Sequence, residues 1–163
     1  HAGSGEFFYA SEEALFGSVH DRERELGDRL GVKLCAELSA DRTLIHAPLA
    51  VGHHVDHQLV LQAALQLRSN RFRVRFYEDY PYAEDVQSLD EALELCTSSL
   101  VPMVETLNEE DLKAKIAAIR LYHSQVRVLF GGEASVAPRI ESYALRLGAG
   151  RGYGERYWER AST

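Results

Sequence analysis

The run Val51–His57 concentrates the residues of this chain that are most suited to chemistry. It holds three of the seven histidines, and Asp56 lies between the last two of them. Neutral imidazole is the commonest metal ligand among side chains, and it titrates near neutral pH. A neighbouring carboxylate can bond one ring nitrogen and fix the tautomer. The run therefore predicts a metal-binding or catalytic site, with a polar helix cap that holds no metal as the alternative.

The spacing of His54 and His57, three residues apart, decides what the run can do. In the first turn of a helix, residues at that spacing project from the same side. One imidazole can then hold a metal while the other faces a substrate, and His53 points elsewhere. A catalytic zinc site generally uses three protein ligands and an open water position, whereas this run supplies at most two. The spacing alone leaves both the metal site and the polar cap open.

The segments on either side of the histidines place them where active sites commonly form. Residues 41–48 have the pattern of a buried strand, and residues 58–67 have the spacing of a packed helix. Catalytic side chains often lie where the carboxyl end of a strand meets a loop and a helix start. The alternation of charged and apolar residues predicts a second strand over 71–77. The acidic pair after it, Glu78 and Asp79, is interpreted as a strand end rather than a catalytic base.

The rest of the chain alternates helices and strands, which predicts an α/β layered fold. The first expected helix covers residues 21–30, is capped by Ser18 and is ended by Gly31. A helix that follows Asn108 as its cap is expected to place Tyr122 or His123 on its buried side. The other expected elements are a short helix opened by a capping box over 88–91, a strand over 99–105, a helix over 140–147 and a strand over 155–159. Pro102 places its strand at a sheet edge or a bulge. We expect a single domain over residues 7–163, preceded by a cloning scar or linker over residues 1–6.

Composition argues against several classes of function. The net charge of −7 argues against a nucleic-acid-binding surface. No apolar stretch approaches the length of a membrane span, and no secretory signal pattern is visible, so we expect a cytoplasmic protein. Cys35 and Cys96 lie far apart without a CxxC spacing, and we expect two reduced thiols.

Several stretches together resemble one family of enzymes. The run from Pro48 to Val60 closely resembles the second signature of the PIG-L deacetylases, a zinc-dependent N-acetylglucosaminyl deacetylase group. Further stretches match that family in the same order along the chain, over residues 11–17, 76–82, 115–125 and 153–158. The likeness spans about residues 8–159, and ordered matches are far more specific than the histidine run alone.

The resemblance implies a Rossmann-like α/β fold and a zinc-dependent hydrolase that deacetylates an amino sugar or a related small molecule. It assigns His57 as the zinc ligand and gives His54 and Asp56 catalytic roles. His54 would stabilise the oxyanion of the tetrahedral intermediate, and Asp56 would support and tune that histidine. The physical logic agrees, because zinc polarises an amide carbonyl and a cationic imidazole offsets the developing negative charge.

The chain departs from the family pattern in the first signature. The Ala-His-Pro-Asp-Asp-Glu run, which supplies the other two zinc ligands and the general base, is absent from this sequence. Val55 replaces a common proline, and Gly52 stands near where some members carry a tyrosine that helps protonate the leaving group. We therefore interpret the chain as the carboxyl-terminal portion of a deacetylase, without the first strands of the sheet. Zinc is expected in the parent enzyme, whereas this chain alone is expected to be inactive.

A non-catalytic relative is the alternative interpretation. Such an α/β module would bind a sugar or a nucleotide-sugar, or would act through self-association. Under either interpretation an apolar sheet edge or face needs a cover, and pairing with another copy is the simplest one. The expected partners are a small-molecule N-acetylated substrate and a second copy of the chain, with no nucleic acid and no membrane.

Overall fold

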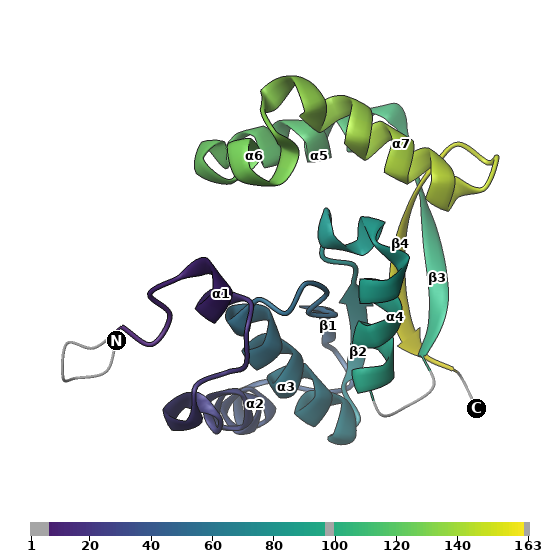
Figure 1. Cartoon of the computed structure of the whole chain (residues 1–163). Coiled ribbons are helices and arrows are strands. Elements are labelled where there is room, and N and C mark those ends of the chain that lie inside the picture. Colours follow the sequence, from purple (N-terminus) through teal and green to yellow (C-terminus); the bar gives the residue numbers. More distant parts are fainter. Residues whose placement is uncertain (1–6, 97–99, 162–163) are drawn as a thin grey trace. The chain divides into compact units, whose positions relative to one another are not determined.

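The computed structural model describes residues 7–96 and 100–161, and both stretches contain helices and strands (Figure 1). The linker predicted over residues 1–6 lies outside the described residues. The helices are α1 (Glu12–Leu15), α2 (Leu26–Glu37), α3 (Val55–Ser69), α4 (Val86–Leu95), α5 (Glu109–Arg120), α6 (His123–Phe130) and α7 (Val136–Gly148), with short 3-10 turns at Asp21–Glu23, Tyr82–Glu84 and Glu133–Ser135. The strands are β1 (Leu44–Pro48), β2 (Arg73–Tyr77), β3 (Leu100–Leu107) and β4 (Tyr153–Arg160). No helix in the described part of the chain is long and apolar enough to cross a membrane.

Within the described residues the strands form a sheet in the order β1-β2-β4-β3. β1 and β2 are parallel, with Ala47 opposite Phe76, and α3 connects them. A parallel pair of this kind needs a long crossover, which the helix supplies. β3 lies at the edge of the sheet, as Pro102 within it predicts. The predicted α/β fold class is confirmed.

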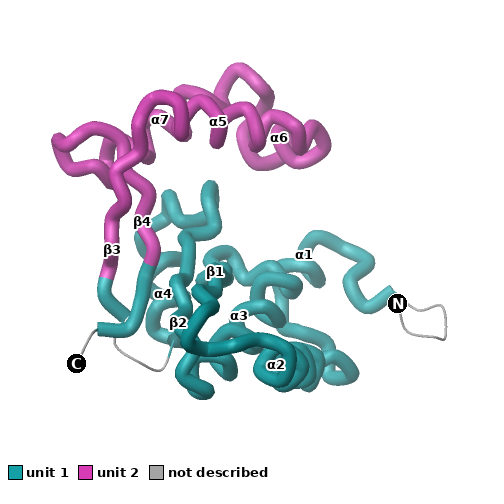
Figure 2. The backbone as a smooth tube through the Cα atoms, turned by 180° about the vertical axis from the view of Figure 1, so that it is seen from behind, with its two compact units in different colours: residues 1–101, 158–163 teal, residues 102–157 magenta. Residues whose placement is uncertain are grey.

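Unit 1 of the chain covers residues 1–101 and 158–163 (Figure 2). Its most deeply buried large side chains include Phe76 on β2 and Leu67 on α3. Leu49 and Val51, which precede the histidines, and Val55, which lies between His54 and His57, are buried to the same degree. Because protein interiors are close-packed, these apolar anchors hold the polar residues between them in a fixed position. A single domain over residues 7–163 stays a prediction.

Helix α2 packs against α3 through two glycines, and it continues past its predicted end. A Cβ atom on Gly27 would lie 2.7 Å from the backbone oxygen of Leu59, and one on Gly31 would meet the side chain of Gln66. Residues four apart share one face of a helix, so the two glycines together allow a close approach. Gly31 therefore serves helix packing. The helix predicted over residues 21–30 is wrong at both ends, because α2 begins and ends later.

Gly27→Ala is expected to lower the free energy of unfolding by about 1–3 kcal/mol, in spite of the higher helix propensity of alanine. The added methyl group would overlap a backbone oxygen that cannot move without shifting α3. Gly31→Ala is expected to lower it less, since the amide end of Gln66 can rotate away. Urea denaturation of both variants measures the difference, and a larger loss for Gly31→Ala would contradict this packing.

Unit 2 covers residues 102–157 and contains α5, α6 and α7 (Figure 2). Asn108 caps α5 as predicted, because its side-chain oxygen accepts from the backbone N–H of Asp111 at 2.9 Å, and the Asp111 carboxylate accepts from the backbone N–H of Asn108 at 3.1 Å. The helix ends at Arg120. Tyr122 then leaves the helical conformation with ψ of 59°, so Tyr122 and His123 are both exposed. Their predicted burial was wrong.

Helix α4 begins before the capping box that the sequence predicted. The carboxylate of Asp85 accepts a hydrogen bond from the backbone N–H of Gln87 at 3.0 Å and from the hydroxyl of Ser88 at 3.1 Å. Asp85 is therefore the N-cap, and Ser88 lies in the first turn of the helix. Aspartate and serine are comparable N-caps, so local preference alone does not separate the two positions.

Candidate active site

The histidine run lies at the edge of the sheet where the parallel strands β1 and β2 end. β1 ends at Pro48, and a loop then leads to α3, which begins at Val55. The backbone N–H of Leu49 donates to the carbonyl of Tyr77 at 3.0 Å, which joins this loop to the last residue of β2. Ligands of open α/β sheets bind outside the carboxyl ends of the strands. The sequence therefore folds so that the histidines and the residues after β2 meet at that edge.

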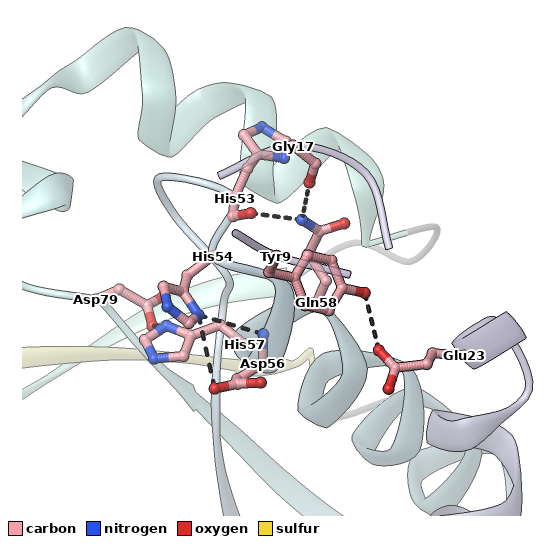
Figure 3. A network of polar contacts seen from close by, with 9 residues as sticks. All are labelled: Tyr9, Gly17, Glu23, His53, His54, Asp56, His57, Gln58 and Asp79. Atoms are coloured by element: carbon pink, nitrogen blue, oxygen red, sulfur yellow. Dashed lines mark hydrogen bonds and ion pairs between the residues drawn. The ribbon is translucent and has the colours of Figure 1, made fainter. Parts of the chain in front are cut away.

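The loop between β1 and α3 has an unusual backbone. Ala50, Gly52 and His53 all have φ near the left-handed region, at 60°, 84° and 61°. At Gly52 a Cβ atom would lie 2.7 Å from the ring of Tyr82, so only glycine fits there. Non-glycine residues in this region store strain, and such strain gathers at functional sites. Figure 3 shows the outcome for the side chains, with His53 turned away from His54 and His57 as their spacing predicts.

His57 is held by Asp79, which follows β2. The Nδ1 atom of His57 lies 2.6 Å from one carboxylate oxygen of Asp79. The other oxygen accepts a hydrogen bond from the backbone N–H of Val51 at 3.0 Å. Asp79 is buried, at 4% exposure, so its charge requires such partners. The pair fixes the orientation of the imidazole and leaves Nε2 as the nitrogen that can bind a ligand.

The bond to Asp79 raises the pKa of the His57 imidazole, against the opposing effect of burial. Nearby negative charge from Asp79 and Asp56 raises this pKa further. A histidine whose folded-state pKa is raised contributes stability that is fully present below its unfolded pKa, about 6.5, and lost as the pH rises through the folded value. Because the His57 side chain is 37% exposed, solvent screens much of this contribution.

Asp79→Asn is expected to lower the pKa of His57 in the metal-free protein, because an amide carries no charge to stabilise the imidazolium. NMR titration of the histidine ring protons measures this pKa residue by residue. The matched control is Asp56→Asn, which removes the same charge from an exposed position and is expected to have a smaller effect. An unchanged His57 pKa in Asp79→Asn would show that the two side chains do not interact.

His54 is both the N-cap of α3 and a neighbour of His57. Its Nδ1 accepts a hydrogen bond from the backbone N–H of Asp56 at 3.2 Å, so the neutral ring carries its proton on Nε2. The ring centroids of His54 and His57 are 5.4 Å apart. The carboxylate of Asp56 is exposed and lies 4.0 Å from His54 Nδ1, beyond hydrogen-bonding distance. Asp56 therefore acts on His54 through its backbone and its charge.

Aromatic side chains flank the two histidines. The ring of Phe16 meets His54 edge-on, with centroids 5.4 Å apart, and the ring of Tyr82 lies 5.7 Å from Phe16. The side-chain amide of Gln58 donates to the backbone oxygens of His53 and Gly17, which ties the segment after α1 to the histidine run (Figure 3). Apolar surface of this kind restricts water around His54.

The resemblance to the deacetylase family implies zinc, and the described residues provide one histidine that could serve as a ligand, His57. An imidazole anchored by a buried carboxylate is the usual arrangement around a metal-bound histidine. His57 and Asp79 have that arrangement. The residues that the structure describes contain no group of three or more histidine, cysteine, aspartate or glutamate side chains that could hold a metal ion. They therefore do not complete a zinc site by themselves.

Sequence reasoning missed Asp79 and Tyr82 as members of this site. Glu78 has the structural role predicted for the acidic pair, because its carboxylate accepts from the Trp158 indole N–H at 2.8 Å. Asp79 instead contacts His57, and this role was not predicted. The available signal was topological, since two parallel strands end at the same edge and bring the residues that follow them together.

No family model matches the sequence. The 2'-N-acetylparomamine deacetylase of Niallia circulans is 30% identical to this chain over 136 residues, which is 80% of this chain and 45% of that protein. Among solved structures, the zinc-inhibited form of teicoplanin deacetylase Orf2 superposes with a TM-score of 0.67 at 24% identity, over 86% of this chain and 53% of that one. A triple mutant of the same deacetylase superposes with a TM-score of 0.64 at 26% sequence identity, over 86% of this chain and 58% of that one. These relatives are deacetylases.

The comparisons confirm the Rossmann-like α/β fold that the resemblance implies. The chain spans about half the length of the relatives that it matches. The names of these relatives give 2'-N-acetylparomamine and teicoplanin as the compounds that they deacetylate.

Proposed function

We propose that this chain is part of a zinc-dependent deacetylase that acts on N-acetylated amino sugars or related small molecules. The observation that carries the proposal is the His57–Asp79 pair, at 2.6 Å, beside His54 at the carboxyl edge of a parallel strand pair. The resemblance of the histidine run to the PIG-L signature and the similarity to deacetylases support the same reaction. We also propose that the protein is cytoplasmic and that it associates with a second copy of itself.

In this proposal His57 would hold the metal through Nε2, because Nδ1 is engaged by Asp79. A bound zinc ion would supply Lewis-acid chemistry, polarising the amide carbonyl and lowering the pKa of a water. A catalytic zinc site uses three protein ligands, so we place the remaining ligands and the general base outside the described residues. Asp79 acts as a positioning residue, since it fixes the imidazole plane and the tautomer.

His54 would stabilise the transition state. Its Nε2–H can donate to the oxygen on which negative charge develops, since its Nδ1 accepts from the backbone N–H of Asp56. The carboxylate of Asp56, 4.0 Å from His54 Nδ1, would add favourable negative charge beside that ring. Phe16, edge-on to His54, would limit competing water on that side.

An amine-release assay tests this proposal on the purified chain and on the longest protein that its gene encodes. N-acetylglucosamine, glycosides that contain it and N-acetylated aminoglycosides are suitable substrates, with zinc added and the released amine measured. We expect zinc-dependent turnover in a protein that completes the metal site, and none in the chain alone. Turnover that persists in His57→Ala would contradict the assigned metal ligand.

A non-catalytic module that binds sugars, nucleotide-sugars or another copy of itself is the second candidate. The described residues provide one expected metal ligand, His57, and no group of three, which favours this second candidate. The distinguishing result is sugar binding without amine release in a protein whose zinc content is stoichiometric. Zinc-dependent turnover would exclude this candidate.

A further inference from the structure

A polar pocket lies in unit 1, at the opposite end of β2 from the histidines. It has a volume of about 430 Å³, and its lining includes Arg68, Arg71, Phe72, Arg73, Glu159 and Arg160. These residues come from the carboxyl end of α3, the amino end of β2 and the last residues of β4 (Figure 1). The histidine site lies beyond the carboxyl end of β2, so the two sites are separate.

The pocket concentrates positive charge in a chain whose net charge is −7. Among the lining residues that the structure describes, four carry a guanidinium group and Glu159 alone carries a carboxylate. This carboxylate already pairs with Arg75, at 3.4 Å. Among the residues that the structure describes, Arg71, Arg73 and Arg160 enter no ion pair. Like charges gathered in this way repel each other, so folding alone gives no reason for the cluster.

Arg68 is the pocket arginine that is partly buried, whereas Arg71, Arg73 and Arg160 are exposed. Burial lowers the pKa of the Arg68 guanidinium, against a smaller opposing effect of Cys96, and the positive charge of Arg160 lowers this pKa by a still smaller amount. Arginines near a helix carboxyl end also interact favourably with the helix dipole. That role can apply to Arg68 and Arg71, but it does not apply to Arg73 and Arg160, which lie on strands.

Arg71 occupies a backbone position that normally favours glycine. Its φ is 69°, and it follows the last turn of α3. Its N–H donates to the carbonyl of Arg68, and the N–H of Phe72 donates to the carbonyl of Leu67, both at 3.1 Å. This pair of bonds forms a Schellman motif, whose left-handed residue is most often glycine. An arginine here stores backbone strain, which is typical of a functional position.

We propose that this pocket binds a small molecule through a phosphate group. Guanidinium groups match phosphate oxygens with two parallel hydrogen bonds each, and a cluster of them suits a dianion better than a monovalent carboxylate. The volume lies within the range of small-ligand pockets, about 300–1,000 Å³. Phe72 and Val74, which are both buried, form the apolar base of the pocket beside the arginines. This binding is independent of the proposed deacetylase function.

Isothermal titration calorimetry of the full chain tests the pocket at constant ionic strength. The probes are inorganic phosphate and glucose 6-phosphate, with glucose as the uncharged control and chloride as the control for screening. We expect both phosphates to bind, and Arg73→Gln and Arg160→Gln each to weaken binding by about tenfold or more. Arg29→Gln is the matched control, since it removes the same charge from an exposed site on α2 and is expected to leave binding unchanged.

Arg71→Gly separates ligand binding from folding. It is expected to weaken phosphate binding while keeping or raising the melting temperature, because glycine accepts a positive φ without strain. A lower melting temperature with unchanged binding would overturn the proposal, as would equal binding by glucose and glucose 6-phosphate. Phosphate affinities that are equal in the wild type and in all pocket variants would overturn it as well.

Discussion

Replacing Asp79 by alanine is expected to lower the free energy of unfolding by about 2–4 kcal/mol. The buried carboxylate accepts the backbone N–H of Val51 and pairs with Nδ1 of His57, and both groups would lose their partner. Leaving a buried polar group unsatisfied costs about 1–3 kcal/mol, and more where a charge is involved. Breaking one side of a buried ion pair has a similar or larger effect. Chemical denaturation of the metal-free chain measures this loss.

Asp56→Ala is the matched control for Asp79→Ala. Both changes remove an aspartate beside a histidine, but the Asp56 side chain is 79% exposed. Its loss is expected to lower the free energy of unfolding by less than about 1 kcal/mol, through the weaker helix dipole interaction at the start of α3. Equal losses in the two variants would show that Asp79 has no special role in holding the loop.

Replacing His54 by alanine is expected to slow deacetylation by about 10²–10³-fold in a protein with a complete metal site, because an oxyanion donor is lost. The metal should remain bound, since His57 and Asp79 are unchanged. His57→Ala is expected to remove the metal together with the activity. Steady-state amine release and zinc analysis by mass spectrometry measure the two effects separately.

His54 also caps α3, so its substitution affects stability as well as catalysis. His54→Ser is the control for this second role, because serine is a good N-cap that lacks an imidazole. We expect His54→Ser to be more stable than His54→Ala and to deacetylate as slowly as His54→Ala does. Wild-type rates in His54→Ser would mean that the imidazole does not donate to the reacting oxygen.

The local parts of the site could be predicted from the sequence because they depend on neighbouring residues. The strand before the histidines, the helix after them and the common side of His54 and His57 all follow from spacing and pattern. Asn108 was predictable for the same reason, since a cap is chosen within one turn. The fold class followed from the alternation of elements.

The other parts of the site depend on contacts between distant segments. Asp79 reaches His57 only because β1 and β2 pair in parallel and end together. The ring of Tyr82, which comes from another loop, leaves no space for a Cβ atom at Gly52. Gly31 has the local signature of a helix end, yet the packing of α2 on α3 uses it inside the helix. Tertiary packing overrides local preference in each of these cases.

Zinc titration of the metal-free chain, followed by NMR of the histidine rings, tests the central claim most directly. Because His57 is a single histidine ligand, we expect weak zinc binding. Zinc bound at Nε2 should shift the ring signals of His57, while those of the exposed His123 stay unchanged. His57→Ala should abolish this binding, and Asp79→Asn should weaken it by about 10–100-fold. Zinc that shifts His123 as strongly as His57, or that binds His57→Ala with unchanged affinity, would contradict the assignment of His57 as the metal ligand.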